Sequence, residues 1–573
     1  MKLRKINSSL AIFLIYFFVF SFFDAKPAKP RVENNLYNKE NFSNYFSGTV
    51  SFDNNDFDIS VNKLKKIEKL GNIHKQYINE YIFALVHNQK ISEAFKFSKN
   101  IQKEKSELSF YTNLLLALNF LNNNNYNKSM QYLKKIINNQ NTPNFQQIIV
   151  KGIFNYLNAF NNFSEKDTFF LESRLTGFNK INEAFYNCYL GNLNAEEDFL
   201  KLVNSEDMGY SRYDFFYLNY LVSKDFKKKA SNFLNTRKEK HQNNLLFNQG
   251  AIWVNNKNYK KIKNIFNCRK PKHVISEYLY LIANLYSSEE KFNLSNFYLN
   301  LSIYFNKNFS SNKFLLAENL FNLGDFKNSE KNYRSFDSKD EIFYWYAQKR
   351  LFWILKKTKN EERALDFIVN NFDKIKNFDA VHFYDLANFY KNLEKYSESI
   401  QFYSKSLEIL EKKNELYAEI LYRRGGSYER LKLYQESEKD LLESLKIVED
   451  DPYVLNYLAY SWIERNKNIN KSMKMLEKAH SLKDEDPYIA DSLAWANFLV
   501  GKYDKAEKLQ QKALKLMPND PIVNDHYGDI LWKQNKKLEA RYFWKYVLSL
   551  EDAEEEMKKK IKEKLIFGLN KKS

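Results

Sequence analysis

A segment near the C-terminus places small and apolar residues at helical intervals and reads DSLAWANFLVGKYDKAEKLQQKALKLMP. Its small residues Ala494, Ala506 and Ala513 would let two antiparallel helices approach closely. Gly501 is placed to end the first helix, because glycine commonly follows a helix C-terminus. Pro518 is placed to end the second helix. The pattern therefore predicts one pair of antiparallel helices.

The small residue of the second helix recurs along most of the chain. In the C-terminal half its intervals are 34 to 38 residues, and a fixed period of this length is typical of a solenoid of stacked units. The regular members are Ser60, Ala94, Ser129, Ser295, Ser329, Ala364, Ser399, Ser437, Ser472, Ala506 and Ala540. Weaker units fall near Ser164, Ala195, Ala230 and Ile262. We expect about fifteen units between residues 45 and 550.

The C-terminal segment resembles the tetratricopeptide repeat (TPR) consensus. Leu493 and Ala494 occupy the position of its Leu-Gly pair, and Tyr503 and Leu516 fall on further consensus positions. The resemblance implies an all-α fold, a right-handed superhelical solenoid of antiparallel helix pairs. It also implies a role in repeat packing for Ala494, Gly501, Ala506, Ala513, Pro518, Gly528 and Ala540.

A more specific resemblance extends over residues 380 to 550. It is carried by the segments 456–462 (NYLAYSW), 486–495 (DPYIADSLAW) and 524–529 (NDHYGD). These segments look like exported TPR proteins of alphaproteobacteria, although Ala459 and Ala494 stand where the repeat prefers glycine. This resemblance implies a scaffold on the periplasmic side of the membrane, without a known reaction.

In the TPR family the first helix of each pair lines a concave surface. When positions are counted so that the Leu-Gly pair is seventh and eighth, the fifth and ninth positions face inward and the twelfth lies one turn further on. Rigid aromatic side chains among polar groups suit a peptide-binding surface. We therefore expect a partner-binding groove formed by Asn456, Tyr460, Asp491, Trp495, Phe498, Asp525, Asp529 and Trp532. Alternatively, some of these rings pack between neighbouring helices or under a closing helix. The basic ladder with which some family members hold a C-terminal carboxylate is absent from these positions, so a basic or extended apolar segment fits better than an acidic tail.

The first 28 residues have the layout of a signal peptide or a signal anchor. Lys2, Arg4 and Lys5 precede an apolar stretch from Leu10 to Phe23. This stretch is short for a membrane-spanning helix, which needs ~20 residues. We therefore expect export to the periplasm or the periplasmic face of the membrane. Retention in the inner membrane by an uncleaved anchor is the alternative.

The sequence divides into five parts. They are the signal segment 1–28, a polar linker 29–45, degenerate TPR-like repeats 46–290, well-defined TPR repeats 291–550 and a polar C-terminal capping helix 551–573. A polar last helix would cover the apolar face that a solenoid exposes at its end.

Composition adds three points to this picture. The 573 residues include only 13 Gly and 8 Pro, which favours helices over many short strands. The net charge of +19 comes from Lys interleaved with Glu and Asp, as on a solvated helical surface, and export argues against nucleic acid as a partner.

The cysteines Cys188 and Cys268 lie 80 positions apart. A linear solenoid would place them in non-adjacent repeats, so we expect free or buried thiols.

The sequence carries no recognisable catalytic motif. It lacks a phosphate loop, a dinucleotide fingerprint and a zinc signature, and its seven His residues have no metal-binding spacing. We predict no enzymatic activity, catalytic residue, metal, cofactor or small-molecule substrate. The expected function is a scaffold that binds protein or peptide partners in cell-envelope assembly or maintenance. The alternatives are an accessory subunit of an envelope enzyme or secretion complex and, more remotely, a TPR-containing glycosyltransferase.

Overall fold

The structure is a computed structural model of the chain, and it describes residues 38–72, 74–105, 107–161, 176–205, 211–237, 244–338, 341–375 and 378–569. The expected signal segment, the first part of the expected linker and Ser164 lie outside the described residues. Within the described ranges, no helix has the length and apolarity needed to span a bilayer.

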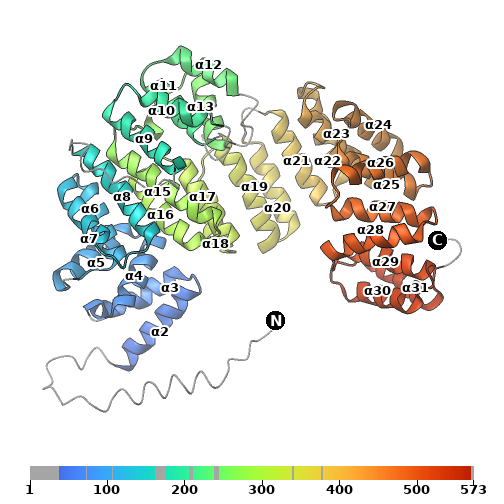
Figure 1. Cartoon of the computed structure of the whole chain (residues 1–573), viewed down its shortest axis with the longest axis horizontal. Helices are drawn as coiled ribbons and strands as arrows, with labels where there is room; N and C mark the ends of the chain where they lie inside the picture. Colours follow the sequence, from blue (N-terminus) through green and yellow to red (C-terminus); the bar gives the residue numbers. More distant parts are fainter. Residues whose placement is uncertain are drawn as a thin grey trace. The chain divides into compact units, whose positions relative to one another are not determined.

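The regular structure of the described residues consists of thirty α-helices and one 3-10 helix (Figure 1). The helices as far as α18 are α2 (Lys39–Asp53), α3 (Phe57–Leu64), η2 (Lys65–Asn72), α4 (Lys75–His87), α5 (Ile91–Glu104), α6 (Phe110–Asn122), α7 (Tyr126–Ile137), α8 (Asn144–Phe160), α9 (Thr176–Leu190), α10 (Ala195–Val203), α11 (Tyr213–Ser223), α12 (Lys227–Arg237), α13 (Leu245–Asn255), α14 (Tyr259–Ile265), α15 (Pro271–Ser288), α16 (Phe292–Phe305), α17 (Ser310–Asn322) and α18 (Phe326–Tyr333). The later helices are α19 (Glu341–Thr358), α20 (Glu361–Phe372), α21 (Ala380–Asn392), α22 (Tyr396–Ile409), α23 (Glu415–Arg430), α24 (Tyr434–Ile447), α25 (Pro452–Glu464), α26 (Ile469–Leu482), α27 (Pro487–Leu499), α28 (Tyr503–Leu516), α29 (Pro521–Lys533), α30 (Lys537–Ser549) and α31 (Glu555–Phe567).

A residue with left-handed backbone conformation lies in the turn between the two helices of most pairs. Its φ angle is between 54° and 80°, and neighbouring members lie 32 to 38 residues apart, except for gaps of 67 and 70 residues, each close to two periods. The members are Asn55, Gln89, Asn124, Gly191, Asp225, Lys257, Glu290, Gly324, Glu394, Lys432, Asn466, Gly501 and Asn535. The series therefore follows the expected repeat period in the described residues. It continues through the weakly patterned region at Gly191, Asp225 and Lys257.

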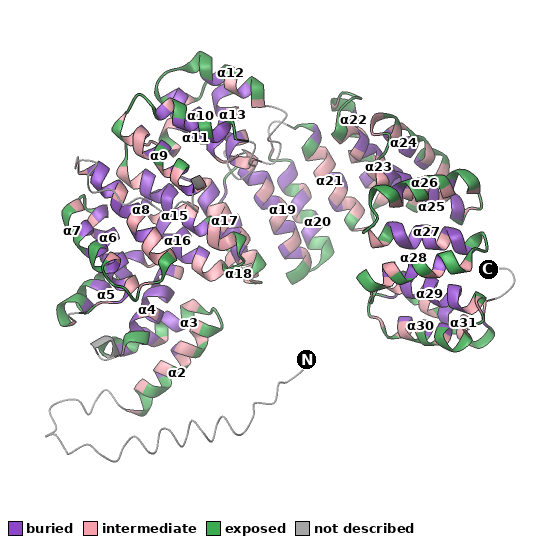
Figure 2. Cartoon of the chain, viewed as in Figure 1, coloured by how far each residue is buried: buried purple, intermediate pink, exposed green. Residues whose placement is uncertain are grey.

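The small position of the second helix is buried in every described repeat. Each described member of the series, from Ser60 to Ala540, is at most 2% exposed. Figure 2 shows buried residues recurring along the helices of both units. Ser129 Oγ donates to the carbonyl oxygen of Ala117 at 2.8 Å, and Ser329 Oγ donates to that of Ala317 at 3.0 Å. Each acceptor lies seven residues before the left-handed turn, where Ala494 and Gly528 lie in later repeats. Small residues on both helices therefore allow the close approach within a pair.

The first helices of the last three pairs begin in the same way. Asp451, Asp486 and Asp520 precede α25, α27 and α29, and each carboxylate accepts hydrogen bonds from two backbone N–H groups of the first turn. A proline follows each aspartate at the first helical position, where a backbone N–H would have no partner within the helix. The Asp-Pro pairs thus fix where each inner helix starts.

The chain forms two compact units, residues 1–354 and 355–573, which we describe separately. The expected boundary at residues 290/291 marks a different property, the point where the sequence repeat becomes regular. In the C-terminal unit, successive pairs stack on one another and α31 packs against α30. The exposed side of α31 is charged and includes Glu555, Glu556 and Lys560.

In the N-terminal unit, the pair α15–α16 packs against the first helices α4, α8 and α9 (Figure 1). Phe297 of α16 stacks on Phe83 of α4 with ring centroids 5.1 Å apart, and it lies edge-on to Tyr111 of α6 at 5.2 Å. Tyr278 of α15 donates to the carbonyl oxygen of Ile149 in α8 at 3.0 Å. Gly152 makes room for this contact, since a Cβ there would lie 2.0 Å from the Tyr278 hydroxyl oxygen.

This packing overturns the expectation of free cysteine thiols. Cys188 of α9 and Cys268, between α14 and α15, form a disulfide with their Cα atoms 5.9 Å apart. The expectation was wrong because it allowed each repeat to contact only its neighbours in sequence, whereas α15 returns to α8 and α9. The disulfide therefore joins repeats that are distant in sequence and adjacent in space.

We predict that replacing both Cys188 and Cys268 by serine destabilises the N-terminal unit by about 4 kcal/mol, because cross-linking a loop of this length restricts the unfolded chain. Urea unfolding followed by limited proteolysis of the N-terminal unit would measure the loss. Wild-type protein treated with a reductant is the control and should match the variant. Two alkylatable thiols in the untreated protein would contradict the disulfide.

Candidate protein-binding face

The inner face of the C-terminal unit is defined here by the second, fifth and ninth positions of its first helices, counted so that Ala459, Ala494 and Gly528 are eighth. These positions are spaced by three and four residues, so they lie on one side of each helix. The second position carries Tyr453, Tyr488 and Ile522, whose exposed fractions are 45%, 64% and 49%. The inner face therefore presents one large exposed apolar side chain in each of three consecutive repeats.

Trp495, at the ninth position of α27, is held between neighbouring side chains. Its ring stacks on Phe498 at 4.7 Å and on His526 of the next repeat at 4.1 Å. Its Nε1 donates to Glu464 Oε1 of the preceding repeat at 2.6 Å. Trp495 thus joins three repeats and keeps only part of its surface free. Phe498 is buried beneath it.

Asp491, at the fifth position of α27, is buried by two partners. Gln510 Nε2 donates to its Oδ1 at 2.5 Å, and Nδ1 of His526 lies 3.0 Å from the same oxygen. Burial opposes protonation of His526, but the carboxylates of Asp491, Asp525 and Asp529 outweigh it and raise the pKa of the imidazole. Asp491 and His526 therefore form an internal ion pair between repeats rather than a free acidic site.

The closing helix α31 takes up the acidic residues of the last repeat. Lys564 Nζ donates to Asp525 Oδ1 at 2.6 Å and to both carboxylate oxygens of Asp529 at 2.8 Å. Asp529 Oδ1 also accepts from Trp544 Nε1 at 3.0 Å. Burial and the neighbouring Asp525 raise the pKa of Asp529 to about 6. These two aspartates therefore bind the chain's own lysine.

Trp532 is covered at the same end of the C-terminal unit. A Cβ at Gly568, where φ is +71°, would lie 2.1 Å from the Trp532 ring, so only glycine allows the segment after α31 to approach so closely. Trp532 also packs against Trp544, with ring centroids 5.2 Å apart. The alternative of rings packed under a closing helix therefore describes this residue.

Two expected groove residues remain in the preceding repeat. Asn456 and Tyr460 of α25 are half-buried. Burial raises the pKa of the Tyr460 hydroxyl. The side-chain oxygen of Asn456 is buried and has no hydrogen-bond partner among the described residues. The structure thus brings Asn456, Tyr460 and part of Trp495 to the same side of neighbouring first helices as the exposed Tyr453 and Tyr488.

The second-position row is the part of this face that the sequence interpretation missed. A signal for it exists, because Tyr453, Tyr488 and Ile522 each directly follow an Asp-Pro pair that caps a first helix. Fifth- and ninth-position residues of the last two repeats are covered by side chains of neighbouring helices, such as His526 of α29 and Lys564 of α31. The second position lies nearer the helix start and stays exposed.

In the N-terminal unit the corresponding face is occupied by the chain itself. Phe83 is at the ninth position of α4 and Tyr111 at the second position of α6, counted back from the turns at Gln89 and Asn124. Both contact Phe297 of α16. These two inner positions are therefore covered by the chain's own α16.

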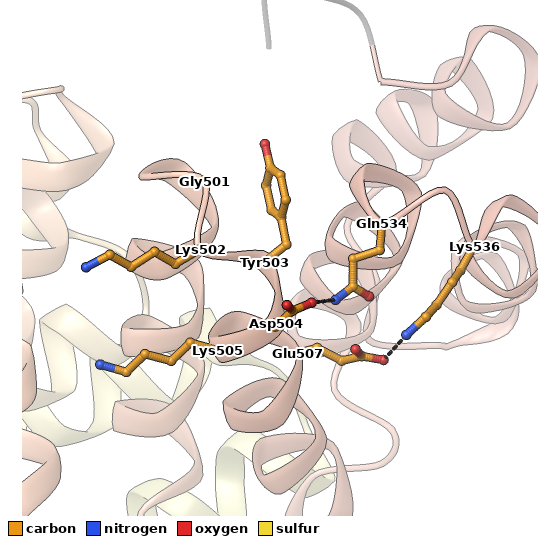
Figure 3. Close-up of a pocket in the computed structure, with 8 residues that line it drawn as sticks. All are labelled: Gly501, Lys502, Tyr503, Asp504, Lys505, Glu507, Gln534 and Lys536. Atoms are coloured by element: carbon orange, nitrogen blue, oxygen red, sulfur yellow. Dashed lines mark hydrogen bonds and ion pairs between the residues drawn. The ribbon is translucent and has the colours of Figure 1, made fainter.

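A cavity of about 630 Å³ lies elsewhere, at the turns of the last two helix pairs (Figure 3). Gln534 Nε2 donates to Asp504 Oδ1 at 3.1 Å, and Lys536 Nζ donates to Glu507 Oε1 at 2.6 Å. These contacts cross from one repeat to the next, so the polar groups of the cavity serve repeat packing. Across the described part of the chain, no group of three or more His, Cys, Asp or Glu is arranged to hold a metal ion.

Comparisons with known proteins agree with the repeat architecture. Residues 383–411, which cover most of α21 and α22, match the tetratricopeptide repeat family. A TPR repeat-containing protein of Pseudomonas aeruginosa is 30% identical over 110 residues, which are 19% of this chain and 18% of the relative's length. The match therefore spans less than a fifth of that relative.

Three solved structures are similar at low identity. PilF of Pseudomonas aeruginosa is 17% identical, with 40% of this chain and 100% of that chain covered and a TM-score of 0.31. A thermophilic TPR protein of Thermus thermophilus is 14% identical, with coverages of 33% and 99% and a TM-score of 0.29. YrrB, described as a TPR protein with an unusual peptide-binding site, is 15% identical, with coverages of 36% and 98% and a TM-score of 0.26.

The paired helices, the left-handed turn found in thirteen described pairs and the buried small residues define an all-helical, TPR-like repeat array. One of its pairs, at residues 383–411, matches the tetratricopeptide repeat family.

The ion pair of His526 and Asp491 predicts a pH-dependent stability of the last repeats. A histidine whose pKa is raised by folding stabilises the folded state below its ordinary pKa of about 6.5, and this contribution is lost as the pH rises through the folded value. Hydrogen exchange of α27 to α29 should therefore become faster relative to the rest of the unit as the pH rises above about 6.5, after correction for intrinsic exchange.

His526→Gln and Asp491→Asn should each remove this pH dependence. The control is the exchange of α21 and α22, which do not contact the pair. An unchanged pH profile in His526→Gln would contradict the assignment.

Proposed function

We propose that this TPR protein is an exported scaffold that binds protein or peptide partners through the inner face of its C-terminal unit, in the assembly or maintenance of the cell envelope. TPR arrays act generally through protein or peptide partners, and we assign the chain no catalytic role. The observation that carries the proposal is the exposed row Tyr453, Tyr488 and Ile522.

The row has the properties of a peptide-binding surface. Aromatic anchors supply much of the energy of protein interfaces, and a repeat array presents them at regular intervals. Tyr488 lies one turn before Asp491, which Gln510 of the same repeat and His526 of the next repeat hold in place. A rigid surface loses little conformational entropy on binding, which favours affinity.

The chemistry of the face favours an extended segment with apolar side chains. Asp491, Asp525 and Asp529 already have internal cationic partners, so they offer little to a basic partner. The exposed side chains of the row, Tyr453, Tyr488 and Ile522, are mainly apolar. Of the two partner classes expected from the sequence, the extended apolar segment is therefore the one we propose.

Two observations support the proposal of export. The N-terminal residues have the order of charge and apolarity found in signal segments. The disulfide between Cys188 and Cys268 is of a kind that persists in oxidising compartments such as the bacterial periplasm and is rare in the cytosol. We propose the periplasm, or the periplasmic face of the membrane, as the location.

Tyr488→Ala should weaken partner capture without loss of fold. Tyr488 is the most exposed member of the row, and removal of an aromatic anchor typically costs about 2 kcal/mol or more, which is a ~30-fold weaker complex. The measurement is quantitative mass spectrometry of envelope proteins retained by the immobilised full chain.

Tyr542→Ala is the matched control, because Tyr542 of α30 is 67% exposed but lies on a second helix. It should retain the proteins that Tyr488→Ala loses, with both variants melting like the wild type. Equal retention by Tyr488→Ala and the wild type would exclude this face as the binding surface.

A reporter fused after residue 45 should be active outside the cytoplasm, because the preceding residues contain the signal segment. Alkaline phosphatase, which needs periplasmic disulfides, is a suitable reporter. Replacing Leu10 to Phe23 by polar residues is the control and should abolish its activity. Full activity of a cytoplasm-dependent reporter at the same fusion point would contradict export.

A further inference from the structure

The turns within the last four helix pairs make up one edge of the C-terminal unit, which is called the turn edge below. Its residues are 430–435, 464–469, 499–504 and 533–538. The guanidinium of Arg465 lies 4.5 Å from the centre of the Tyr434 ring in the preceding turn. Gln534 Nε2 donates to Asp504 Oδ1 at 3.1 Å between the last two turns (Figure 3). The turns therefore lie side by side at one end of the stacked helices.

The two ends of these helices differ in charge. The turn edge carries eight basic residues and two acidic ones. The basic residues are Arg430, Lys432, Arg465, Lys467, Lys502, Lys533, Lys536 and Lys537. At the other end, the loops 448–451, 483–486, 517–520 and 550–554 carry ten acidic residues and one basic residue. Helices such as α27 and α28, with 13 and 14 residues, separate the two ends by about 20 Å.

Exposed aliphatic side chains project from the turn edge. Leu538, at the start of α30, is 82% exposed, and Leu499 and Val500 in the preceding turn are 45% and 38% exposed. Leu431 and Leu433 are exposed in the first of the four turns. Moving such side chains from water into an apolar environment is favourable. The turn edge therefore combines positive charge with apolar surface that the fold leaves uncovered.

The positive charge of the turn edge is only partly neutralised within the chain. Lys467 Nζ pairs with Glu438 at 3.2 Å and thereby joins two repeats. Lys432, Lys502 and Lys537 are exposed, and they form no ion pair with the residues that the structure describes. The charges of these three lysines are therefore available to an anionic surface.

We propose that the turn edge binds the surface of an anionic phospholipid bilayer. This goes beyond the proposed function, because it gives the C-terminal unit a lipid contact in addition to a protein partner. The lysines would lie among the phosphate headgroups, and the exposed leucines would enter the boundary between headgroups and acyl chains. The acidic loops would face away from the bilayer. Tyr453 and Tyr488 lie at that far end, directly after Asp-Pro pairs, so the exposed row would stay open to a partner.

A bilayer fits this edge better than a second copy of the chain does. The acidic loops of a second copy would match the positive charges of the turn edge. A protein partner, however, would also need a shaped pocket for each projecting side chain, such as Leu538. A fluid bilayer receives these side chains without a matching shape, and it supplies anionic and apolar groups together. The bilayer is therefore the occupant that we propose.

The test places an environment-sensitive fluorophore on the turn edge of the full chain through Leu538→Cys. The two native cysteines form a disulfide, so a thiol reagent modifies the new cysteine alone. Vesicles of phosphatidylglycerol should shift the emission to the blue as the label leaves water, and vesicles of phosphatidylcholine should not. The same label at Glu485→Cys, in an acidic loop, should respond to neither. Attachment to vesicles through the N-terminal segment alone would leave both labels in water.

The combined substitutions Lys432→Glu, Lys502→Glu and Lys537→Glu test the role of charge. Glutamate suits the turn position of Lys432, because Glu394 has the same left-handed conformation in an earlier turn. Lys502 and Lys537 lie at helix starts, where a negative charge is favourable. The vesicle concentration for half of the shift should rise at least ~100-fold, because each lysine near an anionic bilayer contributes about 1 kcal/mol and 1.4 kcal/mol is tenfold.

The combined substitutions Lys439→Glu, Lys474→Glu and Lys508→Glu are the matched control. They change the net charge equally, at exposed positions in the middle of the second helices α24, α26 and α28. This variant should respond to phosphatidylglycerol like the parent chain, because salt screens charges that lie away from the bilayer.

No shift of the Leu538→Cys label with phosphatidylglycerol, or an equal shift of the Glu485→Cys label, would overturn the proposal. Equal losses in the two lysine variants would also overturn it. A shift that appears without vesicles as the protein concentration rises would assign the turn edge to a second copy instead. Because the vesicles contain no partner protein, these results are independent of the proposed function.

Discussion

The contact between two small side chains inside most helix pairs is the constraint on which the rest of this protein depends. A serine or alanine of the second helix packs against the eighth position of the first, as Ser129 does against Ala117. The contact fixes the distance between the helices and therefore the direction in which the next repeat stacks. It also decides which positions of the first helix remain available to a partner, because the side of the first helix that faces the second helix is buried within the pair.

The same repeat supports two different inner faces. In the N-terminal unit, α15 and α16 lie against α4, α8 and α9, and the disulfide between Cys188 and Cys268 fixes this arrangement. Aromatic residues at inner positions, such as Phe83 and Tyr111, are used for this internal contact. In the C-terminal unit the corresponding positions are divided between contacts of adjacent repeats and exposed anchors. One repeat type thus builds both a self-filled unit and a unit with a surface for partners.

The repeat could be predicted from the sequence because it depends on local spacing. The buried small residues recur at one interval, and the structure confirms them even at Ala195, Ala230 and Ile262. The disulfide could not be predicted because it needs the return of α15 to α9, which no local pattern encodes.

The candidate site was predictable only in part, because some of its contacts join residues that are distant in sequence. Asp525 and Asp529 carry the expected polar chemistry, but Lys564 of the closing helix neutralises it. The exposed residues after each Asp-Pro pair had a signal that could have been read from the sequence.

The central claim is that the inner face is filled in the N-terminal unit and open in the C-terminal unit. Hydroxyl-radical footprinting of the intact full chain with mass spectrometry tests it most directly, because aromatic side chains react in proportion to their solvent access. The account predicts fast modification of Tyr453 and Tyr488 and strong protection of Phe83 and Phe297. Modification of Phe83 and Phe297 at the rate of Tyr488 would show that α16 does not occupy the N-terminal face and would contradict the account.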